Sequence, residues 1–253
     1  MNIGVFTGAS SGIGKEFVLR LDEKHDFDEI WLIARRADKL QELASQVRAK
    51  VRVLSLDLCK TESVEEYASQ LKDCNANVTV LVNASGFGRF GAFEDISLSD
   101  MMEMTDLNSK ALMAMTYATL PYMKKGSEIY QMGSLSSFQP IPYIGVYAAS
   151  KAYVLSFSRA LNRELKTRGV RCMAVCPGWV KTDFFDRAAT DDTIVYYNRF
   201  CTAQQVVQRA LSDMAKGRDV SVCSYQTRAL VLLTKLLPHR IVMNIWCRQQ
   251  KKK

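Results

Sequence analysis

Short runs of Val, Ile and Leu alternate along the chain with longer segments whose apolar residues recur at helical spacing. The apolar runs predict seven β-strands, at residues 2–8, 29–35, 51–57, 78–84, 127–134, 170–178 and 220–225. The segments between most of them are amphipathic, as Leu40, Leu43 and Val47 illustrate. Continuous apolar runs are typical of strands buried on both faces. The pattern therefore predicts an α/β fold, a doubly wound and mostly parallel seven-stranded sheet with helices on both faces.

The 253 residues show no repeat and no early break in composition, so one domain over residues 1–253 is expected. Within it, residues 183–217 are expected to cover the substrate, and residues 225–253 to form a basic, helical C-terminal extension. Apolar runs are too short to cross a bilayer and no signal peptide is recognisable, which favours a cytoplasmic protein. Seven cysteines without a C-x-x-C pair favour reduced thiols, with no metal site.

A glycine-rich turn, "TGASSGIG" at residues 7–14, directly follows the first strand. Residues 8–12 match G-x-S-x-G, which presents a nucleophilic serine in hydrolases, but the three glycines also suit a turn around a dinucleotide pyrophosphate. A hydrolase would need a histidine base, and only His25 and His239 occur, neither in a convincing arrangement with a carboxylate. Phosphate binding is therefore favoured, with the cofactor contacts expected at Gly8, Ser10, Ser11, Gly12, Ile13 and Gly14.

The end of the second strand indicates which cofactor is bound. An NAD site usually has Asp or Glu there to accept a hydrogen bond from the ribose hydroxyl, whereas this strand ends in Arg35 and Arg36. Two guanidinium groups suit a 2′-phosphate, so NADP(H) is favoured over NAD. The alternative is a solvated arginine pair at a loop.

Tyr147 and Lys151 lie four residues apart in a predicted helix that runs to about Arg168. Positions four apart share a helix face, so the Lys151 ammonium is expected beside the Tyr147 phenol, lowering its pKa toward neutral. Such a pair also arises by chance. Ser134, directly after the fifth strand, is expected at the same edge of the sheet.

These motifs together resemble the short-chain dehydrogenase/reductase family, whose fold is Rossmann-like. The resemblance covers Met1 to about Thr182 and rests on the glycine turn, Asp57-Leu58, "NASG" at residues 83–86, Asn108, Ser134, Tyr147 with Lys151, and "PGWVKT" at residues 177–182. One departure is that Ala84 and Ser85 replace the usual Asn and Ala. Another is the roughly thirty residues that follow the seventh strand.

The resemblance implies a role for each matching residue. Tyr147 would be the general acid, Ser134 would bind the substrate carbonyl, Lys151 would tune Tyr147 and bind the nicotinamide ribose, and Asn108 would anchor a water in a proton relay. Further cofactor contacts would come from Asp57, Leu58, Asn83, Ala84, Tyr147, Lys151, Pro177, Gly178, Val180 and Thr182. The implied activity is interconversion of a ketone and a secondary alcohol by an NADP(H)-dependent enzyme.

Aromatic residues gather in the segments expected near the substrate: Phe87, Phe90, Phe93, Phe138, Tyr143, Phe184, Phe185, Tyr196, Tyr197 and Phe200. They favour an apolar pocket and a lipophilic substrate, such as an acyl or sterol-like ketone, although core packing is the alternative for about half of them. A 3-oxoacyl carrier-protein reductase, a non-catalytic NADP-binding regulator, and an epimerase or dehydratase are the competing functions.

Positive charge is concentrated at the C-terminus. The net charge is +8, and from Arg228 onward the chain has seven Lys and Arg and no Asp or Glu. A basic tail beside a nearly neutral body disfavours nucleic-acid binding. Arg240, Asn244 and Arg248 recur every four residues, which predicts an amphipathic helix after Pro238. This helix is expected to act as a lid or subunit contact, as a membrane-surface anchor, or to be disordered. A homo-oligomer, paired through the Tyr147 helix and its neighbour, is expected by resemblance.

Overall fold

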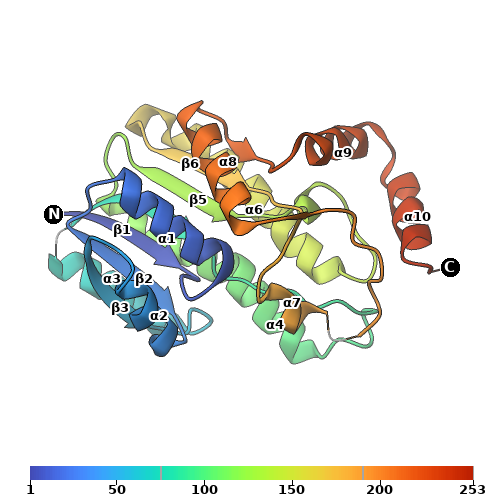
Figure 1. The fold of residues 1–253 in the computed structure, drawn as a ribbon, viewed down its shortest axis with the longest axis horizontal. Coiled ribbons are helices and arrows are strands. Elements are labelled where there is room, and N and C mark those ends of the chain that lie inside the picture. The colour runs from blue at the N-terminus through green and yellow to red at the C-terminus, as the bar shows by residue number, and fades with distance from the viewer. Residues whose placement is uncertain (75, 190, 253) are drawn as a thin grey trace.

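Seven parallel strands form the central sheet of the computed structural model, which describes residues 1–74, 76–189 and 191–252 (Figure 1). The strand order is β3-β2-β1-β4-β5-β6-β9, and every pairing is parallel. The strands are β1 (Asn2–Thr7), β2 (Glu29–Ala34), β3 (Lys50–Ser55), β4 (Asn77–Asn83), β5 (Glu128–Met132), β6 (Arg171–Val175) and β9 (Val220–Ser221). The predicted doubly wound, parallel sheet is confirmed.

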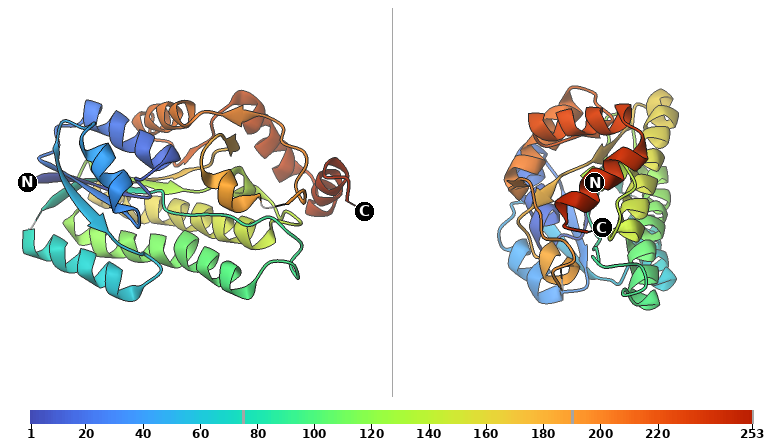
Figure 2. Two further views of the ribbon diagram at one scale, coloured as in Figure 1. Left: turned by 60° about the horizontal axis from the view of Figure 1, so that its bottom comes forward. Right: turned by 90° about the vertical axis from the view of Figure 1, so that its right-hand side faces the viewer.

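Helices cover both faces of the sheet (Figures 1 and 2). One face is covered by α1 (Gly12–Lys24), α2 (Ala37–Ala44) and α8 (Ala203–Ala215), and the other by α3 (Thr61–Cys74), α5 (Leu112–Thr119) and α6 (Gly145–Glu164). The sequence of β2 is continuously apolar because both faces of this strand are buried. Ile30 and Leu32 pack into the core under the first face, whereas Trp31 and Ile33 pack into the second, and all are fully buried.

The remaining elements are short or join the larger ones. They are α4 (Leu98–Thr105), the π-helix η1 (Asp106–Ala111), the 3-10 helices η2 (Leu120–Tyr122), η3 (Leu135–Phe138) and η4 (Leu165–Arg168), the helix α7 (Phe184–Ala188), and the strands β7 (Trp179–Val180) and β8 (Phe200–Cys201). The pair β7 and β8 forms a separate two-stranded sheet that the sequence pattern did not predict. Two-residue strands have no measurable periodicity, so no such signal was available.

The C-terminal extension forms two helices, α9 (Tyr225–Leu236) and α10 (His239–Gln249). The predicted helix after Pro238 is therefore present, but the predicted strand at 220–225 is too long. It stops at Ser221, and the Ser224 side chain caps α9 by accepting a hydrogen bond from the Thr227 amide. Both helices lie at the end of the molecule opposite to the N-terminus (Figure 1). Among the described helices, none has the length and apolar character that crossing a membrane requires.

One buried carboxylate fastens this extension to the body. Asp213 of α8 is fully buried and accepts hydrogen bonds from Arg209 at 2.9 Å, Arg218 at 2.9 Å, Arg228 at 3.1 Å and the Ser221 hydroxyl at 2.9 Å. Arg228 belongs to α9, so this Asp213 cluster joins α8, β9 and α9. A buried carboxylate needs such a set of donors, because it has lost its hydration.

We therefore expect Asp213→Asn to lower the free energy of unfolding by about 3 kcal/mol, because the three arginines lose their shared counter-charge. Thermal and urea unfolding measure this. The matched control is Asp219→Asn, since the Asp219 side chain is 39% exposed and pairs with Arg159 at the surface; a loss of about 0–1 kcal/mol is expected there. Equal losses in the two variants would contradict the stabilising role of the Asp213 cluster.

Candidate active site

A cavity of about 680 Å³ opens at the carboxyl ends of the parallel strands. It joins the glycine turn after β1 to the ends of β2, β3, β4, β5 and β6, where ligands of doubly wound folds are held. With two exceptions, every predicted site residue lines it: Gly8, Ser10, Ser11, Gly12, Ile13, Gly14, Arg35, Arg36, Asp57, Leu58, Ala84, Ser134, Tyr147, Lys151, Pro177, Gly178, Val180 and Thr182. The exceptions are Asn83 and Asn108.

The glycine turn has a geometry that other residues cannot adopt. Gly8 and Gly12 have φ of +64° and +57°, in the left-handed region. Gly14 packs directly against the turn, since a Cβ there would lie 2.2 Å from the Gly8 carbonyl oxygen. Helix α1 starts at Gly12, with its unpaired amides beside the cavity. The turn therefore presents backbone N–H groups and a positive helix end, which suit a phosphate.

Arginines follow the turn at the end of β2. Arg36 Nη2 donates to the hydroxyls of Ser10 and Ser11, at 3.2 Å each, and lies 3.8 Å from the Asp183 carboxylate. Arg35 donates to Glu103 at 3.4 Å. Both arginines are exposed at the cavity edge. This end of the cavity therefore combines two cations with two hydroxyls.

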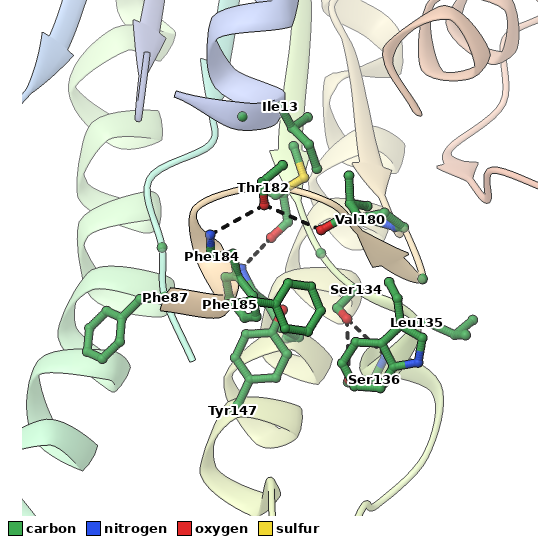
Figure 3. A pocket seen from close by; sticks show the side chains of 18 of the residues that line it. Ile13, Phe87, Ser134, Leu135, Ser136, Tyr147, Val180, Thr182, Phe184 and Phe185 are labelled. Carbon is green, nitrogen blue, oxygen red and sulfur yellow. Dashed lines mark hydrogen bonds between the residues drawn. The ribbon is translucent and has the colours of Figure 1, made fainter. Parts of the chain in front are cut away.

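Ser134, Tyr147 and Lys151 meet between β5 and α6. Lys151 is 3% exposed; its ammonium donates to the Met132 carbonyl at 2.8 Å and lies 5.7 Å from the centre of the Tyr147 ring. Ser134 is the N-cap of η3, where its Oγ accepts from the Ser136 amide at 3.1 Å. The Phe184 ring lies 5.6 Å from the Tyr147 ring on the cavity side (Figure 3).

The protonation of this group differs from the prediction. Burial raises the pKa of Tyr147 to about 12, and a hydrogen bond with Ser134 only partly opposes the increase. Burial also lowers the pKa of Lys151 to about 8. The predicted lowering of the Tyr147 pKa toward neutral is therefore wrong for this structure. Desolvation of the phenolate outweighs the hydrogen bond with Ser134, and the Lys151 ammonium donates to a backbone carbonyl.

The two predicted residues outside the cavity wall are buried behind it and hydrogen-bonded to other parts of the protein, although Asn83 Oδ1 has no partner among the described residues. Asn108, in η1, is completely buried; its Oδ1 accepts from the Phe87 amide at 3.1 Å, and its Nδ2 donates to the Phe87 carbonyl at 2.9 Å. Asn83 donates to Thr116 at 3.1 Å and to Gln131 at 3.0 Å. As placed here, Asn108 holds the backbone beyond β4 and Asn83 holds β4 against β5, so neither offers a direct contact.

The aromatic residues divide as the two alternatives allowed. Five line the cavity, namely Phe87, Phe90, Phe184, Phe185 and Tyr196. Phe93 is 74% exposed, and Tyr197 and Phe200 pack beside Phe185 with ring centres 5.6 and 5.5 Å away. Thr182 Oγ1 accepts from the Phe184 amide at 3.4 Å at the start of this segment (Figure 3). The predicted cover at 183–217 is thus divided, because α8 packs on α1 instead of over the cavity.

The C-terminal helices supply a wall of the cavity, which agrees with the lid alternative for the helix after Pro238; the contribution of α9 was not predicted. Leu230, Val231 and Thr234 of α9, and Val242, Ile245, Trp246 and Gln249 of α10, line it. Trp246 Nε1 donates to the Pro142 carbonyl at 3.0 Å, which holds α10 beside the start of α6. Gln250, 1% exposed, accepts from the amides of Val195 and Tyr196. The apolar spacing in 230–234 and 242–246 was the available signal.

Comparisons with known proteins agree with this geometry. The model of the short chain dehydrogenase family matches residues 2–193. The chain belongs to this family. It is 34% identical to sulfoacetaldehyde reductase 2 of Chromohalobacter salexigens, over 75% of this chain and 79% of that protein. It is 33% identical to an NADP-dependent 3-hydroxy acid dehydrogenase of Schizosaccharomyces pombe, over 71% and 72%. A Sphingobium yanoikuyae short-chain dehydrogenase in complex with NADPH superimposes with a TM-score of 0.80, at 25% identity and 96% coverage of both chains.

The protein is accordingly a short-chain dehydrogenase, an oxidoreductase that acts on alcohol and carbonyl groups. The contacts of Arg187 at the cavity edge could not be predicted from the sequence. Arg187 of α7 stacks 3.3 Å from the Phe87 ring centre and donates to Glu103 at 2.6 Å, with Asp100 3.7 Å away. Glu103 is the same carboxylate that pairs with Arg35. Because these partners are distant in sequence, no local pattern indicates the pairing.

The glycine geometry yields a test of dinucleotide binding by this dehydrogenase. Gly14→Ala is expected to raise the Kd for NADPH about tenfold or more, since its Cβ must push against the Gly8 carbonyl and displace the turn. Fluorescence titration measures it. Gly145→Ala is the control, because a Cβ there meets no atom within 4 Å. An unchanged Kd for Gly14→Ala would contradict the assignment of this turn to the cofactor.

Proposed function

We propose that this short-chain dehydrogenase uses NADP(H) and reduces a lipophilic ketone to a secondary alcohol. One observation carries the proposal. A single cavity has Arg36, Ser10 and Ser11 at one end, Ser134, Tyr147 and Lys151 in the middle, and aromatic and aliphatic side chains at the other end. A dinucleotide spanning the first two parts would bring its nicotinamide to the third.

The proposed mechanism assigns the proton to Tyr147 and the hydride to the cofactor. NADPH, when bound, supplies a hydride to the carbonyl carbon. The Ser134 hydroxyl donates to the carbonyl oxygen and orients it, and the Tyr147 phenol gives that oxygen its proton. The Lys151 ammonium stabilises the phenolate that remains and offers its other protons to the nicotinamide ribose. Asn108 acts through the backbone that it holds, as a positioning residue.

The protonation states of Tyr147 and Lys151 at neutral pH favour the reducing direction. With a pKa of about 12, Tyr147 carries its proton at neutral pH and is ready to act as an acid. Alcohol oxidation needs the phenolate, which is scarce at that pH. The Lys151 ammonium, with a pKa of about 8, is present at neutral pH to receive the negative charge that forms.

The preference for NADP(H) rests on the arginine end of the cavity. Arg36 and the two serine hydroxyls form a set of donors that fits a 2′-phosphate, and Arg35 adds a second cation nearby. The same cofactor is named for the Schizosaccharomyces pombe relative and for the Sphingobium yanoikuyae structure.

The preference for a lipophilic ketone rests on the opposite end. The names of the two enzyme relatives point to small anionic compounds, which would require a cation facing the substrate. Arg187 is the cavity-lining arginine other than Arg35 and Arg36 in the described part of the chain, and Glu103, Asp100 and the Phe87 ring already engage it. Aliphatic and aromatic side chains from α7, α9 and α10 make up much of the remaining wall, which suits an uncharged substrate.

Basic residues near the cavity support a second candidate, a 3-oxoacyl carrier-protein reductase. Arg240 and Arg248 lie on α10, which lines the cavity, so an acidic carrier protein would meet positive charge there.

A homo-oligomer is also proposed, because the exposed faces of α5 and α6 carry Met113, Tyr117 and Tyr153, exposed by 42%, 83% and 39%.

The central test is NADPH oxidation with a panel of bulky apolar ketones, small anionic oxo acids and 3-oxoacyl thioesters. We expect the bulky ketones to be preferred, and Tyr147→Phe to lower kcat by about 10²–10⁴ because the proton donor is lost. NADPH binding of this variant should remain. Tyr153→Phe, on the same helix, should match the wild type. Full turnover by Tyr147→Phe would refute the catalytic assignment, and preference for the oxo acids would refute the substrate class.

The pKa values predict opposite pH profiles for the two directions. Alcohol oxidation should rise by about tenfold per pH unit up to about pH 8, as Tyr147 loses its proton more often, and level off above it, because Lys151 then loses the charge that stabilises the phenolate. Ketone reduction should be level below about pH 8 and fall above it, because Lys151 then loses its charge. Initial rates with buffer controls measure both. In Lys151→Met the fall above pH 8 should disappear; a fall that persists there would show that another group titrates.

Cofactor choice is tested at Arg36. We expect Arg36→Gln to raise the Kd for NADPH about tenfold to a hundredfold while leaving that for NADH unchanged, since only NADPH has a 2′-phosphate. The control is Lys39→Gln, which removes an exposed charge on α2 that pairs with Glu42. Parallel loss of NADPH and NADH affinity in Arg36→Gln would show that Arg36 supports the turn in general.

A further inference from the structure

Helix α9 presents apolar side chains on two opposite faces. Its inward face lines the cavity, as described above, whereas Leu232, Leu233 and Leu236 point outward and are 62%, 50% and 81% exposed. Ile241 and Ile245 of α10 continue this surface, with 45% and 44% exposure. A helix that is apolar on both faces is normally covered on both. We call these five residues the outer apolar surface.

The outer apolar surface adjoins the rim of the cavity. Leu230 of α9 and Ile245 of α10 both line the cavity, and both are partly exposed to solvent, by 37% and 44%. The right-hand view of Figure 2 shows α9 and α10 together at this end of the molecule. At Leu230 and Ile245, apolar side chains therefore continue from the cavity wall to the exterior of the protein.

Positive charge flanks this surface. Arg240, Asn244 and Arg248 share one side of α10, next to Ile241 and Ile245. Residues 220–253 include no Asp or Glu. Within the described part of the chain, no carboxylate lies within salt-bridge distance of Arg240, Arg248 or Lys251. An apolar strip bordered by unpaired cations is the arrangement that binds an anionic lipid surface.

We propose that α9 and α10 dock on an anionic membrane surface, with the cavity rim facing the lipid, so that the ketone enters from the bilayer. The source of the substrate rests on the proposed function; the docking itself does not. A second copy would bring one basic surface against another. An acidic carrier protein would match the charge but leave the three outer leucines without an apolar partner. A lipid surface satisfies both features.

The test is co-sedimentation of the full chain with vesicles of phosphatidylcholine, alone or with about one third phosphatidylglycerol. We expect binding to the anionic vesicles that weakens with salt. Leu232→Gln/Leu233→Gln/Leu236→Gln should weaken it about tenfold or more, since the apolar contact is lost. Arg240→Gln/Arg248→Gln should remove the preference for anionic vesicles. The matched control, Arg163→Gln/Lys166→Gln, removes two exposed charges elsewhere and should bind as the wild type does.

Two further measurements separate the alternatives. Sedimentation velocity without vesicles would overturn membrane docking if the triple leucine variant dissociated a larger assembly, because the occupant would then be a second copy. Failure of the wild type to bind vesicles, or equal binding by all variants, would overturn it as well. Reduction of a water-soluble ketone in vesicle-free buffer should be unchanged in the triple variant. Vesicle binding without turnover of any ketone would retain docking and reject the proposed function.

Discussion

The site depends on burying one ammonium group under the sheet edge. Lys151 is almost completely enclosed, and its proton reaches the Met132 carbonyl at the end of β5. Ser137 reinforces the junction by donating to the Lys151 carbonyl at 2.7 Å. These bonds fix the first turns of α6 against β5, so Tyr147, one turn earlier, must face the cavity beside Ser134. Burial also sets the protonation, because the same enclosure that positions both groups disfavours their charged forms.

The sheet and the cavity position could be predicted because they follow from local pattern. Continuous apolar strands imply burial on both faces, and parallel strands bring their following residues to one edge, where the glycine turn, Ser134 and Pro177 meet. The turn itself was predictable, since glycine readily adopts the positive φ that Gly8 and Gly12 have. For these features the short-range sequence contains the physical cause.

Other features depend on three-dimensional surroundings that the sequence does not state. The spacing of Tyr147 and Lys151 indicated proximity correctly, but the sign of the tyrosine shift depended on how completely the protein excludes water. Asn83 and Asn108 follow the family pattern, yet Asn83 donates to Thr116 of α5 and Gln131 of β5, and Asn108 bonds the backbone of Phe87. Half of the ten aromatic residues lie away from the cavity lining, and no periodicity distinguishes them from those that line it.

The carboxylates around α7 connect the arginine end of the cavity to this helix. Arg36 lies near Asp183, which directly precedes α7, and Glu103 is shared between Arg35 and Arg187 of α7. An anion that binds the two arginines competes with the same carboxylates that anchor this helix. Phe184 and Phe185 of α7 line the cavity, and the Phe184 ring lies beside Tyr147. Binding of an anion at the two arginines and binding at the part of the cavity that α7 lines are thereby thermodynamically linked, so each must alter the affinity of the other by the same factor.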